Sequence, residues 1–71
     1  MRYLVVVEQG PTSSGAYVPD LPGCVAGGQT KGEALALIKE AIKLHITDLK
    51  GSGQAVPKPT SVSAVVDVPA A

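Results

Sequence analysis

The sequence predicts an α+β domain in which a sheet of short strands carries one long helix across one face, in the chain order β-β-β-α-β. Two observations support this fold class. Residues 30–51 are long and periodic enough to form a helix, whereas four shorter segments have β character and are bounded by Gly, Pro and Ser. A chain of 71 residues is expected to form one domain, residues 1–71.

The first two predicted strands form a hairpin. Residues 2–8 favour β-structure because Tyr3 is followed by a run of apolar, mostly β-branched side chains. Residues 4–7 are apolar on both alternating faces, so we place this strand inside the sheet rather than at an edge. Residues 16–18 are expected to return antiparallel, and the strand ends where Pro19 removes a hydrogen-bond donor.

A bend separates the second strand from a short third strand over residues 24–27. Pro22 pre-sets φ for the second position of a turn, and Gly23 permits the positive φ that a type II turn needs at its third position. Beyond the helix, a polar, proline-rich connection leads to residues 61–68, which are rich in Val and are expected to form the fourth strand.

The predicted helix carries signals at both ends. At its start, Thr30 and Glu33 have the spacing of a capping box, in which the Thr30 hydroxyl accepts from the Glu33 N–H and the Glu33 carboxylate reaches back to the Thr30 N–H. At its end, Lys50 complements the helix dipole, and Gly51 is expected to adopt the left-handed conformation that stops the helix.

The apolar arc of this helix is wider than one contact with a sheet requires. Leu37 and Leu44 fall near its border, where a second subunit could cover them. The chain also has no Phe or Trp, and a domain of this size buries only about 60% of the surface that its unfolded chain exposes. We therefore expect a homodimer or a homotetramer, with Leu37 and Leu44 in the interface.

Composition excludes several classes of protein. The 6 Lys and Arg residues balance 6 Asp and Glu residues, so the chain does not resemble an electrostatic nucleic-acid binder. A single cysteine, Cys24, excludes both an internal disulfide and a four-thiolate zinc site. The apolar run over residues 3–7 is too short to span a bilayer, and the start of the chain lacks the features of a signal peptide. We expect a cytoplasmic protein without cofactor or metal and without membrane attachment.

A set of residues spread over about two-thirds of the chain resembles the HicB-like antitoxin family. The resemblance is dense in Pro, Gly and Cys at fixed spacing, which is more specific than an apolar pattern. It is carried by residues 17–28, Thr30, residues 33–34, 40–42 and 44–46, Gly53 and residues 56–59.

The resemblance implies a β-β-β-α-β domain, described as a partial ribonuclease H-like fold. It implies a partner as well, a small basic RNA-cleaving toxin of the HicA type, whose RNA-facing surface the antitoxin blocks. Longer members carry a C-terminal DNA-binding segment, whereas this sequence stops at Ala71, so we do not expect direct DNA binding. We place the partner-binding residues in the bend and the strand end before it, at Tyr17, Pro19, Asp20, Leu21 and Pro22.

Ribonuclease H likeness raises the alternative of a two-metal nuclease, which needs carboxylates that hold two ions about 3.5 to 4 Å apart. The sequence shows no convergent cluster among its candidates, which are Glu8, Asp20, Glu33, Glu40, Asp48 and Asp67. Cys24 is expected to be a small buried side chain, and His45 a packed one, rather than a nucleophile and its base.

The leading hypothesis is therefore an antitoxin of a type II toxin–antitoxin pair that acts by steric masking and is not an enzyme. The alternative is a metal-dependent nuclease remnant, or an orphan domain of the same fold that binds a small ligand.

Overall fold

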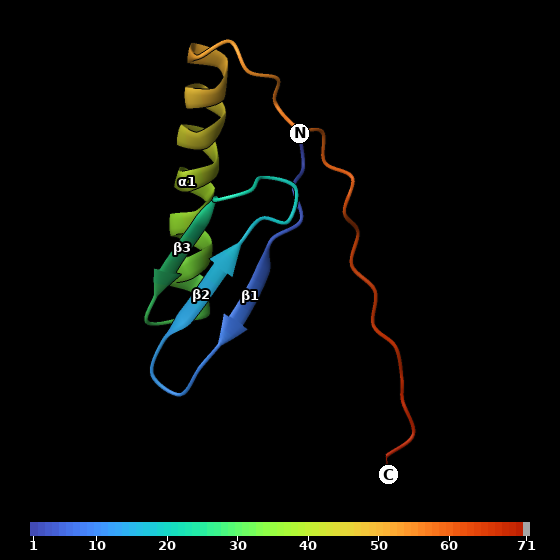
Figure 1. Ribbon diagram of the computed structural model, residues 1–71. Coiled ribbons are helices and arrows are strands. Elements are labelled where there is room, and N and C mark those ends of the chain that lie inside the picture. The colour runs from blue at the N-terminus through green and yellow to red at the C-terminus, as the bar shows by residue number, and fades with distance from the viewer. Residues whose placement is uncertain (71) are drawn as a thin grey trace.

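The computed structural model describes residues 1–70, which form a three-stranded sheet with one helix packed against it (Figure 1). The strands are β1 (Val6–Gln9), β2 (Ser14–Tyr17) and β3 (Val25–Gly28), and the helix is α1 (Lys31–Gly51). Neighbouring strands pair antiparallel in the order β1-β2-β3, with Val7 opposite Ala16 and Ala16 opposite Ala26. The predicted α+β class and the order of these four elements are confirmed.

The core lies between the sheet and the first half of α1 and includes the loop that joins β2 to β3. Ala34 and Ile38 come from the helix and are 0% and 1% exposed. The other buried apolar side chains in residues 1–70 are Ala16, Val18, Leu21 and Cys24. The helix thus packs on the sheet through one narrow stripe, as an amphipathic helix does. In the described part of the chain, no helix has the combination of length and apolar character needed to cross a bilayer.

The start of α1 is capped almost as its sequence indicates. Thr30 Oγ1 accepts a hydrogen bond from the Glu33 N–H at 3.1 Å. Glu33 Oε1 accepts from the Gln29 N–H at 3.2 Å, and not from the Thr30 N–H that we expected. The capping box therefore differs from the usual one in a single bond: the Glu33 carboxylate accepts from the residue before Thr30 instead of from Thr30 itself.

The end of α1 corrects our expectation for Gly51, which lies inside the helix. The left-handed residue is Gly53, with φ of 73°. Its N–H donates to the Lys50 carbonyl at 3.1 Å, and the Gln54 N–H donates to the Leu49 carbonyl at 2.8 Å. These two bonds form a Schellman motif, which satisfies carbonyls that the helix leaves without partners.

At the junction between β3 and α1, the backbone of Gly28 lies very close to the first turn of the helix. A Cβ built on Gly28 would lie 3.0 Å from the Ala34 backbone nitrogen and 2.9 Å from Glu33 Cγ. Only a residue without a side chain allows β3 to end this close to the first turn of α1. The sequence Gly28-Gln29-Thr30 therefore lets the chain leave the sheet and enter the helix cap at once.

The C-terminal part of the chain differs from our expectation. The fourth strand predicted over residues 61–68 does not form, and residues 54–70 contain no regular secondary structure. The segment is extended, but within residues 1–70 it forms no ladder with any other strand, so its strand-forming composition is not matched by strand pairing. It runs on the β1 side of the sheet and away from it (Figure 1).

The position of β1 also differs from our expectation. We placed this strand inside the sheet, yet β1 pairs only with β2 and is an edge strand of the single chain. The reason is the missing fourth strand, because the outer edge of β1 stays open when residues 61–68 do not pair with it.

Candidate partner-binding surface

The loop over residues 18–24 is held by three backbone hydrogen bonds. The Leu21 N–H donates to the Val18 carbonyl at 3.1 Å, and the Cys24 N–H donates to the Leu21 carbonyl at 3.0 Å. The Val18 N–H donates to the Cys24 carbonyl at 3.2 Å and closes the loop. Gly23 has φ of 82°, so Leu21, Pro22, Gly23 and Cys24 form the type II turn that the sequence predicts.

The side chains of this loop point in two directions. Leu21 is 0% exposed and fills the core beneath the loop. Tyr17 is 40% exposed, and Pro19 and Pro22 are exposed. Pro19 and Pro22 thus lie on the surface of a loop that Leu21 fixes from below, and Tyr17 is exposed at the end of β2 just before it, so little conformational freedom is left to lose on binding.

Our placement of Leu21 among the partner-binding residues needs correction, because a side chain without exposed surface cannot contact a partner in this conformation. The sequence signal was ambiguous, since an apolar residue between two turns suits either a buried anchor or an exposed contact. The small domain uses it as an anchor because few other large side chains are available to fill the core.

Asp20 lies in the same loop but is engaged with the C-terminal segment. Its Oδ2 accepts from the N–H groups of Thr60 and Ser61 at 3.0 and 2.9 Å. Its Oδ1 accepts from the hydroxyl groups of the same two residues at 3.1 and 2.8 Å. We call this arrangement the Asp20 latch.

The latch favours the ionised carboxylate. Hydrogen bonds from the Ser61 N–H and hydroxyl, and then from Thr60, lower the pKa of Asp20, although partial desolvation acts in the opposite direction. We expected Asp20 to contact a partner. The structure gives it a different role, with partners 40 and 41 residues away in the sequence. Sequence reasoning missed Thr60 and Ser61, because no local pattern reports so distant a contact.

A second anchor holds the C-terminal segment nearby. The Tyr3 hydroxyl donates a hydrogen bond to the Pro57 carbonyl. Beyond the latch, an open cleft of about 420 Å³ lies between residues 2–4 and residues 61–63. The start of the chain and the β2–β3 loop therefore both contact the C-terminal segment at the same end of the sheet.

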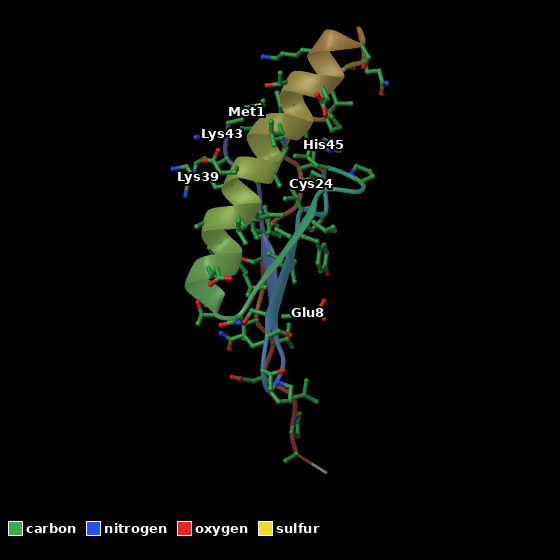
Figure 2. All side chains as sticks on the ribbon, turned by 90° about the vertical axis from the view of Figure 1, so that its left-hand side faces the viewer. Met1, Glu8, Cys24, Lys39, Lys43 and His45 are labelled. Carbon is green, nitrogen blue, oxygen red and sulfur yellow. The ribbon has the colours of Figure 1, made fainter. Side chains whose placement is uncertain are left out.

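The helix exposes the two leucines that we assigned to an oligomer interface. Leu37 is 45% exposed and Leu44 is 66% exposed. Lys39 and Lys43 lie on the face of α1 that points away from the sheet (Figure 2), and Lys43 Nζ pairs with Glu40 at 3.3 Å. Coverage of Leu37 and Leu44 by a second subunit stays a prediction.

The residues with catalytic potential do not form a recognisable centre. Cys24 is 3% exposed, and burial raises the pKa of its thiol, which suits a small packed side chain and not a nucleophile. His45 is half-buried on the sheet-facing side of α1 (Figure 2). Within residues 1–70, no three His, Cys, Asp or Glu side chains are close enough together to hold a metal ion.

Several known proteins are similar in sequence to this chain. The UPF0150 protein of Thermoplasma acidophilum is 43% identical over 61 residues, which cover 82% of this chain and 86% of that protein. A UPF0150 protein of Helicobacter pylori is 41% identical over 64 residues, which cover 89% of both chains. Antitoxin HicB 2 of Photorhabdus laumondii is 35% identical over 71 residues, which cover 99% of this chain but 51% of that antitoxin.

The chain thus spans most of the two UPF0150 relatives and about half of the relative named as an antitoxin. Residues 3–70 match the family described as the HicB-like antitoxin of bacterial toxin–antitoxin systems. This match includes the three strands, the helix, the Asp20 latch and the extended segment after it. The chain therefore belongs to the HicB-like antitoxin family.

Proposed function

We propose that this protein is the antitoxin of a type II toxin–antitoxin pair and that it binds a small RNA-cleaving toxin of the HicA type. It acts by covering the surface through which the toxin reaches RNA, and it performs no chemistry itself. The observation that carries this proposal is the match to the antitoxin family over residues 3–70.

The surface of the β2–β3 loop supports a docking role. Pro19 and Pro22 are exposed there on a backbone that Leu21 and the type II turn hold in place, and Tyr17 is exposed at the end of β2 beside the loop. Tyr is enriched among residues that dominate binding energy, and a preformed loop loses little entropy when it binds. The formal net charge of zero favours recognition by shape and apolar contact over charge complementarity.

Inhibition of a cognate toxin is the direct test. The small reading frame next to the gene for this chain would be co-expressed with it, and the purified toxin would be titrated with this protein in an RNA-cleavage assay. We expect a stable complex and loss of cleavage at a stoichiometric amount of antitoxin. A toxin that continues to cleave RNA in excess antitoxin would contradict the proposal.

Two variants locate the contact. Tyr17→Ala removes the exposed ring and is expected to weaken binding at least about tenfold, as truncation of an interface hot spot does. Thr47→Ala changes an exposed position of α1 and is the matched control, with affinity expected to stay within about twofold. Equal affinities for both variants would place the contact elsewhere on the protein.

The same preparation tests the nuclease alternative. The chain alone, supplied with Mg²⁺ or Mn²⁺, is expected to leave RNA and DNA intact. Cleavage that persists through purification and is lost in Asp67→Asn would establish an enzyme instead, since a two-metal nuclease depends on its carboxylates.

A further inference from the structure

The C-terminal arm, residues 62–70, has the composition of a strand and no strand to pair with. Every residue of the arm is exposed. Val62, Val65, Val66 and Val68 are exposed by 86%, 96%, 75% and 79%. The radius of gyration is 14.2 Å, against about 11 Å for a compact chain of this length, because the arm extends away from the domain.

The arm is amphipathic in the sense of a β-strand. Side chains alternate between two faces in extended backbone, so Val62, Ala64, Val66 and Val68 share one face. Ser63, Val65 and Asp67 lie on the other. A valine side chain has on the order of 100 Å² of apolar surface, so the arm exposes roughly 350 Å², and patches of this size on monomers are commonly binding sites.

The outer edge of β1 lacks a neighbouring strand. Residues 4–7 are apolar on both alternating faces, and β1, which contains the last two of them, has a neighbouring strand on one side only. An apolar edge of this kind is a template for another strand. β3, at the opposite edge, carries Gly27 and Gly28 and offers much less apolar surface.

The arm of the same chain does not cover this edge. The Asp20 latch holds Thr60 and Ser61 beside the β2–β3 loop, and the open cleft separates residues 61–63 from residues 2–4. From that point the arm leads away from β1 (Figure 1). Each molecule therefore has a strand-forming arm that pairs with no strand of the described chain and an apolar edge at β1 to which such an arm could add.

We propose that two copies of this chain exchange their arms, so that residues 62–68 of each add as a strand along the β1 edge of the other. A two-fold axis makes the exchange reciprocal and leaves neither an arm nor a β1 edge unpaired. Two arms and the surfaces under them would bury on the order of 1,400 Å², within the range of specific interfaces. The exchange supplies the fourth strand that the sequence predicts, and it does not depend on the toxin.

Intersubunit contacts test this exchange directly. Equal amounts of ¹⁵N-labelled and ¹³C-labelled chain would be unfolded together, refolded and examined by isotope-filtered NMR. We expect nuclear Overhauser effects between residues 62–68 of one chain and residues 6–9 of the other. Arm-to-β1 contacts found only within one chain would overturn the proposal, and so would an arm that shows random-coil chemical shifts in the absence of toxin.

Matched substitutions locate the interface by sedimentation at tens of micromolar. Val66→Asp places a charge on the apolar face of the arm and is expected to give a monomer with unchanged helical circular dichroism. Ser63→Asp places the same charge on the opposite face and is expected to remain a dimer. A monomeric parent protein, or a dimer that withstands Val66→Asp but dissociates in Leu44→Asp, would overturn the proposal.

Discussion

Gly28→Ala tests whether the close approach of β3 to α1 is required for the fold. The added methyl group would lie 3.0 Å from the Ala34 backbone nitrogen, whereas ordinary contacts begin near 3.4 Å, so the helix start has to move by about 0.4 Å. Glu33 Cγ, at 2.9 Å, belongs to a flexible side chain and can rotate away, but the Ala34 nitrogen belongs to the first turn of the helix.

Overpacking of this kind costs about 1 to 3 kcal/mol. Gly28 does not have a positive φ, so alanine adds no backbone strain and restricts the unfolded chain, which offsets about 0.4 to 1 kcal/mol of that cost. The net loss in the free energy of unfolding is about 1.3 kcal/mol at the middle of these two ranges. For a domain of this size, that loss lowers the melting temperature by about 5 to 10 °C.

Thermal and urea unfolding, followed by circular dichroism at one protein concentration, would measure this loss. Gly27→Ala is the matched control, because its added Cβ would lie 3.7 Å from the Ser14 carbonyl oxygen, an ordinary contact. We expect the control to stay within about 0.5 kcal/mol of the parent. Equal stability of the two variants would refute the steric argument.

Three further predictions follow from single residues. Gly32→Ala should raise the free energy of unfolding by about 0.5 to 1 kcal/mol, because the added Cβ meets no neighbouring atom outside its own helix turn and alanine favours helix. Urea unfolding measures this gain, and a loss of stability would contradict the prediction. Leu21→Ala should cost about 2 to 5 kcal/mol in the same assay, since the side chain is 0% exposed, and a cost below 1 kcal/mol would contradict its role as the anchor of the loop. The folded-state pKa of Asp20 is lowered, so the latch contributes stability above the unfolded pKa of about 3.9 and loses it as the pH falls through the folded value. The ¹⁵N heteronuclear effects of Thr60 and Ser61 should therefore fall on acidification below about pH 4, and a similar loss at neutral pH should follow Asp20→Ala; unchanged values would contradict the latch.

Local signals in the sequence predicted the local structure well. Thr30 caps α1, Gly23 takes the positive φ of a type II turn and Cys24 is buried, because each of these outcomes depends on a few neighbouring residues. The shift of the helix stop from Gly51 to Gly53 is a small error of the same kind. Either glycine could end the helix, and the choice depends on where the chain must go next.

Contacts between distant segments could not be predicted in this way. The carboxylate of Asp20 binds Thr60 and Ser61, a choice of partner that depends on the path of the whole chain. The fourth strand was predicted from valine content, but a strand also needs a neighbouring strand to pair with, and residues 61–68 pair with none within the described chain. The sequence indicates strand-forming character and does not say which edge will satisfy it.

The burial of Cys24 makes the protein its own probe of conformational opening. A protonated thiol that is 3% exposed is protected from an aromatic disulfide reagent while the domain is closed. The reagent therefore reacts, and releases its coloured product, only with molecules that have transiently opened. When closing is fast compared with this reaction, the rate of product release gives the equilibrium constant for opening without any engineered label. One thiol per chain keeps that signal free of a second site.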